Sequence, residues 1–146
     1  MDDLYKLFPR LQRSHCRLTS RRTKRYNCPA WAAGDNDVWW GPDQYSYWPR
    51  GVPRQRTLSA FIAAYHTLGY IECASTEYEK GLEKIAIYVN ESDQPVHVAR
   101  QLRDGIWTSK CGTLEDIEHT LEGLEGKEYG SVKCVMKRTR SSGRYQ

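Results

Sequence analysis

The stretch that decides the fold opens with the run Lys84-Ile85-Ala86-Ile87-Tyr88-Val89. Isoleucine, valine and tyrosine favour strands, and this nearly unbroken apolar run indicates a buried one. A turn over residues 90–95 leads to a second run at 96–102. The composition of residues 103–105, Arg-Asp-Gly, is that of a hairpin turn into a third run at 106–109. The stretch therefore predicts a three-stranded antiparallel meander.

The clearest helix signal precedes this meander. Thr57 is a favourable N-cap residue, and Gly69 is typical of a helix end. Between them, apolar side chains recur at the spacing of one helix face: Leu58, Phe61, Ile62, Tyr65 and Leu68. We expect an amphipathic helix there.

A second helix and a last strand are expected after the meander. Thr113 and Asp116 have capping-box spacing, and residues up to Gly126 carry one apolar stripe, formed by Leu114, Ile117, Leu121 and Leu124. Residues 131–137 alternate as an outer strand would. The expected fold class is α+β, with a small antiparallel sheet of four or five strands packed with two or three helices.

Charge is distributed unevenly along the 146 residues, whose formal net charge is +4. Residues 10–25 carry seven Lys or Arg and no acid, whereas residues 131–146 carry five and no acid. The part between them holds nine basic and sixteen acidic side chains. We interpret residues 1–25 as a basic N-terminal arm with a short helix, 26–138 as one globular domain, and 139–146 as a basic flexible tail.

Composition also limits cofactors, partners and location. The five cysteines form no CxxC pair, and Cys and His lack the short spacings of metal ligands, so we expect no metal and no cofactor. No apolar run approaches a membrane helix in length, and the N-terminus lacks the order of a secretory signal, so we expect a cytoplasmic protein without membrane contact. The basic ends favour either solvated arms or contact with nucleic acid. The oligomeric state is left open.

Asn27-Cys28-Pro29 is the motif that indicates chemistry. Proline is favoured at the first position of a helix, so Pro29 would place Cys28 at the N-cap. The partial positive charge there lowers a thiol pKa, so Cys28 has two interpretations, a nucleophile or a small core residue. His97 lies within a predicted strand and is the candidate base, with Ser109 or Thr108 on the next strand to orient its ring.

Further residues are candidates for the oxyanion and for substrate. The Asn27 side chain would help to bind an oxyanion, although asparagine before a helix is also a common turn residue. The aromatic run from Trp39 to Trp48 has two interpretations, packing within an ordered loop or lining of a groove beside Cys28. The candidate substrate-binding residues are Trp31, Trp40, Trp48 and Trp107.

Several motifs resemble an uncharacterised family of small bacterial and fungal domains: YNCPAWA at 26–32, WWGP at 39–42, YWPRGV at 47–52, HVARQL at 97–102 and WTSK at 107–110. The resemblance covers about residues 25–138 and implies membership without a function. More distantly, a cysteine helix followed by hairpins resembles the papain-like superfamily, with its NlpC/P60 and transglutaminase-like members. Two alignments with this superfamily compete. Alignment with transglutaminase-like members makes His97 the base. Alignment with NlpC/P60 members puts Lys84 at the position of the base and His97 at the position of the residue that orients it.

The resemblance implies a papain-like arrangement and a thiol-dependent hydrolase or acyltransferase that acts on an amide bond of a peptide or protein. In this hypothesis Cys28 attacks, His97 takes the thiol proton, and Ser109 or Thr108 orients the ring. The alternative is a non-enzymatic module with an inactive papain-like fold, in which the aromatic loop binds a protein and the basic arms bind a protein or nucleic acid.

Overall fold

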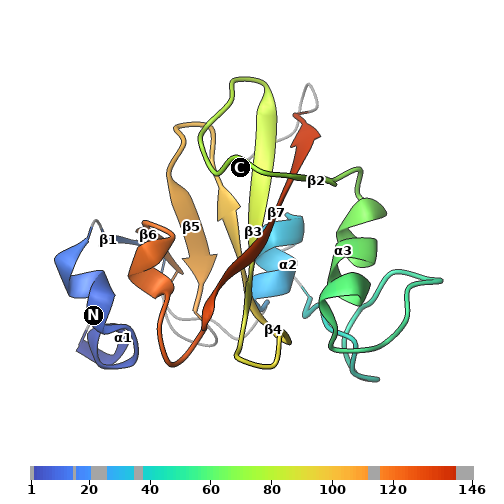
Figure 1. Ribbon diagram of the computed structural model, residues 1–146, viewed down its shortest axis with the longest axis horizontal. Helices are drawn as coiled ribbons and strands as arrows, with labels where there is room; N and C mark the ends of the chain where they lie inside the picture. The colour runs from blue at the N-terminus through green and yellow to red at the C-terminus, as the bar shows by residue number, and fades with distance from the viewer. Residues whose placement is uncertain (1, 15, 21–25, 35–37, 112–115, 141–146) are drawn as a thin grey trace.

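The computed structural model describes residues 2–14, 16–20, 26–34, 38–111 and 116–140. In these ranges the chain forms one seven-stranded sheet with helices around it (Figure 1). The helices are α1 (Asp2–Leu7), α2 (Cys28–Ala33), α3 (Leu58–His66) and the short 3₁₀ turns η1 (Pro9–Arg13) and η2 (Glu122–Leu124). The strands are β1 (Cys16–Ser20), β2 (Ile71–Cys73), β3 (Leu82–Val89), β4 (Pro95–Gln101), β5 (Trp107–Lys110), β6 (Asp116–His119) and β7 (Ser131–Thr139).

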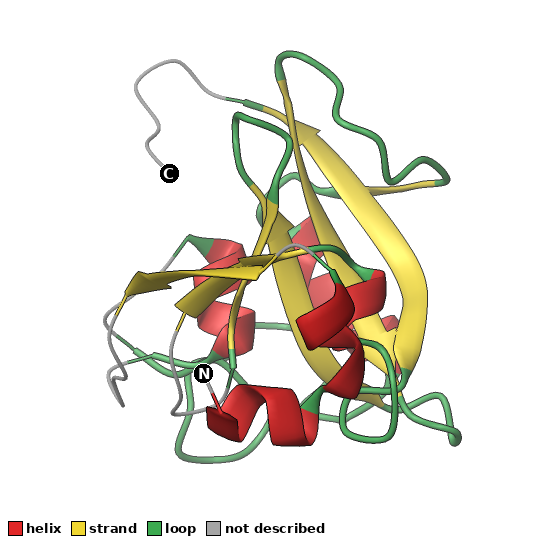
Figure 2. Cartoon of the chain, turned by 90° about the vertical axis from the view of Figure 1, so that its left-hand side faces the viewer, coloured by secondary structure: helices red, strands yellow, loops and turns green. Residues whose placement is uncertain are grey.

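Every neighbouring pair in the sheet is antiparallel, in the order β1-β6-β5-β4-β3-β7-β2. The α+β class is therefore confirmed, but the expected four or five strands were too few. Figure 2 shows the strong twist of the sheet, with long strands upright and short strands lying across them. This twist follows from the chirality of the residues.

The sheet is covered on both faces, because successive side chains of its central strands point in opposite directions. Ile85 and Ile87 of β3 pack with Phe61 and other residues of α3 on one face. Ala86 and Tyr88 pack on the other face, in a cluster that also holds Leu4, Phe8 and Leu11 from the N-terminal segment. Burial of each large apolar side chain stabilises the fold by roughly 1.5–3 kcal/mol.

The meander and the first predicted helix are confirmed. Strands β3, β4 and β5 follow one another in the sheet, and the hairpin closes through a bond of 3.0 Å from Leu102 N to Ile106 O. Helix α3 is capped by Thr57, whose hydroxyl accepts from Ala60 N at 3.2 Å.

The predicted helix over 113–126 is wrong. Its described part forms β6 and the single turn η2, while Thr113 and Leu114 lie outside the described residues. Ile117 is buried in the core, and its polar neighbours are paired on the opposite face: Asp116 accepts from the Tyr26 hydroxyl, and Glu118 bonds Arg17 at 3.0 Å. Such tertiary pairing lets an acidic segment form a buried strand although its apolar spacing is helical.

Part of the basic N-terminal segment belongs to the sheet. The expected short helix forms as α1, and residues 16–20 form β1, which pairs with β6. Of the basic residues expected in the arm, Arg21, Arg22, Lys24 and Arg25 lie outside the described residues. At the other end β7 extends to Thr139, and residues 141–146 of the expected tail also lie outside them.

A stability comparison of two glycines tests the turn before β7. Gly130 has a φ of +68°, and an added Cβ would meet the Val89 carbonyl oxygen at 1.9 Å. Gly81 also has a positive φ, +86°, but open space around it. We expect Gly81→Ala to lower the free energy of unfolding by about 1–2 kcal/mol through backbone strain alone. Gly130→Ala should cost roughly 1–3 kcal/mol more, because the chain must shift. Equal losses in chemical denaturation would contradict this turn geometry.

Candidate functional site

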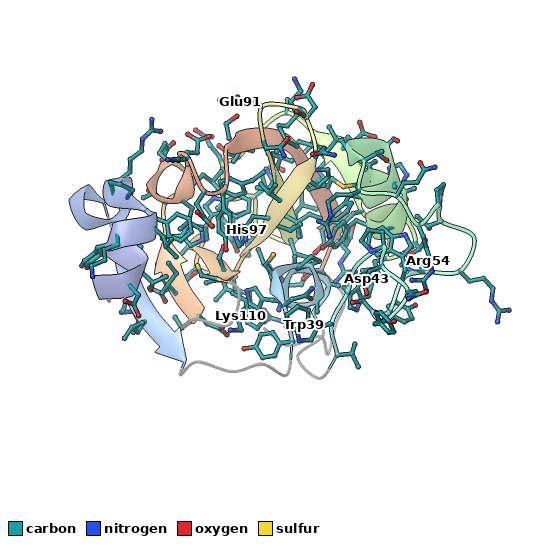
Figure 3. All side chains as sticks on the ribbon, turned by 90° about the horizontal axis from the view of Figure 1, so that it is seen from below. Trp39, Asp43, Arg54, Glu91, His97 and Lys110 are labelled. Carbon is teal, nitrogen blue, oxygen red and sulfur yellow. The ribbon has the colours of Figure 1, made fainter. Side chains whose placement is uncertain are left out.

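A cavity of about 380 Å³ lies between the start of α2, the start of β4 and the loop that follows α2. In Figure 3 His97 lies near the centre of the molecule, and Trp39 and Asp43 lie in the loop that follows α2. The cavity is lined by Asn27, Cys28, Pro29, Trp39, Trp40, Asp43, Arg56, Phe61, Val96, His97, Glu128 and Tyr129. It thus brings the predicted nucleophile and the predicted base to one space.

Asn27, rather than Cys28, is the N-cap of α2. Its side-chain oxygen accepts from Ala30 N at 3.3 Å and from Trp40 N at 2.9 Å, and its amide nitrogen donates to Trp40 O at 2.7 Å. Cys28 is therefore the first helical residue and Pro29 the second. The Asn27 amide ties the aromatic loop to the start of the cysteine helix.

The pKa of Cys28 moves in the direction opposite to the expected one. Burial of the thiol raises its pKa to about 11, and this effect outweighs the lowering by the Val98 and Cys28 N–H groups and by the more distant Arg56 and Lys110. A helix of six residues adds little to oppose desolvation. The resting site therefore holds a neutral thiol.

His97 is the first member of a hydrogen-bonded chain across three strands. Its Nε2 lies 2.8 Å from Ser109 Oγ, which lies 2.6 Å from His119 Nε2. His119 Nδ1 in turn bonds the Thr120 carbonyl oxygen at 2.7 Å. Burial, and secondly the nearby His119, hold the pKa of His97 well below its ordinary value, so the ring is neutral.

Two aromatic rings fix the plane of the His97 imidazole. Tyr129 stacks on it with ring centroids 4.1 Å apart and planes inclined by 9°, and Tyr88 meets it edge-on at 5.3 Å. With Nε2 bonded to Ser109, the ring has a single orientation. Its Nδ1 is buried and has no hydrogen-bond partner among the described residues.

Cys28 reaches the cavity from the start of α2, and His97 reaches it from β4. Because Nδ1 of His97 bonds none of the described residues, no hydrogen bond joins it to the Cys28 thiol. Both groups line the same cavity.

Ser109, Thr108 and Lys84, the alternatives that the sequence leaves open, differ in their contacts. Ser109 contacts the ring, whereas the Thr108 hydroxyl donates to Arg100 O and accepts from Trp31 Nε1 on the other face of the sheet. Lys84 is buried elsewhere, where its Nζ donates to the Ser75 and Glu77 carbonyl oxygens at 2.8 and 2.7 Å. The geometry places His97, rather than Lys84, beside Cys28.

The four candidate tryptophans are distributed over different surroundings. Trp40 lines the cavity, but Trp31 bonds Thr108 outside it. Trp48 is core, packed on Phe61 with its indole N–H bonded to Pro53 O at 3.0 Å. Trp107 lines a separate cavity of about 350 Å³ that also includes His119.

Sequence reasoning missed several residues of the site. Tyr129, Glu128, Asp43 and Arg56 line the cavity, and His119 completes the hydrogen-bonded chain. His119 could have been found from alternation had 116–119 been recognised as a strand, because its partner in register is Trp107, on the same face as Ser109. The other four lie in loops, where no periodicity points to them.

The described residues contain no group of three or more Cys, His, Asp or Glu side chains arranged to hold a metal ion. They also contain no helix that is long and apolar enough to cross a membrane.

Comparison with known proteins identifies a family but no activity. Residues 17–137 match the family described as a domain of unknown function, DUF7689. No curated protein and no solved structure matches the chain. The expected membership of an uncharacterised family is confirmed, whereas the likeness to papain-like enzymes finds no support in these comparisons.

The neutral state of His97 predicts a stability profile. A buried histidine with a lowered pKa binds its proton more weakly when folded, so its contribution is complete above pH 6.5 and is lost as the pH falls below that value. We expect His97→Gln to flatten the decline in the free energy of unfolding between pH 6.5 and 5 by up to about 1.4 kcal/mol per pH unit. Exposed His66→Gln should keep the wild-type slope. Identical slopes for wild type and His97→Gln would contradict a buried neutral ring.

The raised pKa of Cys28 predicts slow alkylation. With a pKa of about 11 its thiolate is scarce at neutral pH, so iodoacetamide should label it on the order of tenfold more slowly at pH 7 than it labels an ordinary thiol. The rate should keep rising with pH toward 11. Peptide-resolved mass spectrometry measures it, with the urea-unfolded chain as control. A rate that levels off below pH 8 would show a pre-formed thiolate.

Proposed function

We propose that the chain, which belongs to the DUF7689 family, is a thiol-dependent hydrolase or acyltransferase in which Cys28 is the nucleophile and His97 the base. The observation that carries the proposal is the shared cavity: Cys28 lines it together with a fixed neutral imidazole whose Nδ1 has no hydrogen-bond partner in the part of the chain that the structure describes. Nucleophile, base and an orienting third group are the parts that covalent catalysis requires. Here Ser109 is the orienting group.

The chemistry begins from two neutral groups. The Cys28 side chain moves toward His97, Nδ1 takes the thiol proton, and sulfur forms a bond to the carbonyl carbon of the substrate. The imidazolium then gives this proton to the leaving amine as the C–N bond breaks, which leaves a thioester on Cys28. Water or an acceptor amine attacks the thioester and releases the acyl group. Proton transfer of this kind contributes about 10²–10⁴-fold to rate.

The start of α2 offers one donor for the oxyanion. Pro29 has no N–H, and the N–H of Ala30 is bonded to Asn27. The backbone N–H of Cys28 is therefore the donor proposed to bind the oxyanion. Asn27 serves by holding the helix start and the Trp40 segment together rather than by direct contact.

The lining of the cavity fits an acyl donor of peptide type. Trp39, Trp40, Phe61 and Tyr129 provide aromatic surface. Arg56 provides a positive charge, and Asp43 and Glu128 provide two negative charges. A mixed lining of this kind suits an amide-bearing segment with both apolar and polar groups. We propose an analogy to papain-like enzymes, in the alignment that makes His97 the base. The common features are a cysteine at a helix start, a histidine on an antiparallel strand and a hydroxyl on the next strand.

Acyl transfer from p-nitrophenyl acetate tests the proposal. We expect an acetyl adduct on Cys28, found by peptide mass spectrometry, and its loss in Cys28→Ala. His97→Gln should slow the acylation by about 10²-fold or more, because the thiol then lacks its base. The matched control is Cys134→Ala, which removes a partly buried cysteine on β7. In this variant Cys28 should be acylated at the wild-type rate. Unchanged acylation in Cys28→Ala, or none above the unfolded chain, would reject the enzyme.

A binding module is the second candidate function, and one observation favours it. The loop beside the cavity exposes aromatic side chains: Trp39 is 42%, Tyr47 52% and Tyr45 90% exposed. Exposed aromatic groups of this kind mark protein-binding surfaces. If Cys28 proves inert, the same cavity and loop would serve as a peptide site without chemistry.

A further inference from the structure

We propose that His119, acting through Ser109, is a positioning residue that keeps the Nδ1 of His97 free of a proton. This inference rests on the proposed function, because an imidazole accepts the thiol proton only at an unprotonated nitrogen. His119 does not line the cavity of Cys28, so any effect on Cys28 must pass through the bonded chain. The role is thus one of setting the state of the base.

The direction of each hydrogen bond follows from the fixed end of the chain. The Thr120 carbonyl can only accept, so Nδ1 of His119 carries a proton. Burial disfavours a charged imidazole, so we take the His119 ring as neutral; its Nε2 then has a lone pair and accepts from the Ser109 hydroxyl. A hydroxyl has one hydrogen, so toward His97 Ser109 accepts, and Nε2 of His97 donates. The remaining nitrogen of a neutral His97, Nδ1, is left with its lone pair.

The surroundings hold this direction in place. His97, Ser109 and His119 are 1%, 0% and 2% exposed, so solvent does not compete for their hydrogen bonds. They stand on β4, β5 and β6, which are neighbours in the sheet. Breaking one of these bonds leaves a buried polar atom unpaired, which destabilises the fold. The chain therefore acts as one unit.

This direction of the hydrogen bonds also suits the transfer of the thiol proton to His97. When Nδ1 takes the thiol proton, the imidazolium still donates from Nε2 to Ser109, and Ser109 still donates to His119. No hydrogen bond has to reverse, and the chain is polarised in the sense that stabilises the positive charge. Without the acceptor on His119, the Ser109 hydroxyl is free to donate to Nε2 of His97, which moves the ring proton to Nδ1 and blocks the base.

Ring-nitrogen NMR of the histidine-labelled full chain tests the inference. We expect the wild type to show His97 protonated at Nε2. His119→Phe should convert His97 to the Nδ1-protonated tautomer and lower the rate of Cys28 acylation by at least tenfold. His119→Gln keeps a hydrogen-bond acceptor, so it should show the wild-type tautomer and the wild-type acylation rate. If His119→Phe does not fold, Ser109→Ala is the second variant, and it should populate both tautomers.

The outcomes separate this inference from the proposed function. An Nε2-protonated His97 in both His119→Phe and Ser109→Ala would overturn the positioning role, even if Cys28 acylates normally. A tautomer change in His119→Phe that His119→Gln reverses supports the role, and the absence of any Cys28 acylation in the wild type would then reject the enzyme alone. Exposed His66→Gln is the control and should leave the His97 signals unchanged.

Discussion

The hydrogen-bonded chain from the Thr120 carbonyl through His119 and Ser109 to His97 is the constraint on which the site depends. It crosses three neighbouring strands, and all three of its side chains are buried. A slip of one residue in any of these strands would turn a member of the chain to the other face of the sheet. The protonation state of the candidate base, His97, therefore depends on the register of the central sheet.

Much of the sheet could be predicted from sequence, because its signals are local. The apolar run at 84–89 and the Asp-Gly turn at 104–105 are enough for the meander, and the spacing from Leu58 to Leu68 is enough for α3. Alternation also places a hydroxyl of the next strand near His97, but it leaves Ser109 and Thr108 as alternatives, and the structure shows the contact with Ser109. These predictions require no knowledge of distant partners.

The remaining features depend on contacts between distant segments. Glu118 is buried because Arg17, about a hundred residues earlier, pairs with it, so a helical pattern gave way to β6. The prediction of a lowered Cys28 pKa was wrong for a similar reason. A cap motif indicates where the helix begins, but only the fold shows that burial has the largest effect on the pKa of Cys28. Tyr129, which fixes the His97 ring, lies in a loop without periodicity.

Cross-linking with 1,3-dibromoacetone probes whether Cys28 and His97 act as a pair across one cavity, as proposed. This reagent alkylates a thiol and then joins it to a second nucleophile within a three-carbon bridge. We expect a cross-link between Cys28 and Nδ1 of His97, found by peptide mapping and absent in His97→Gln. A Cys28 that is alkylated but bridged to another residue, or to none, would contradict it.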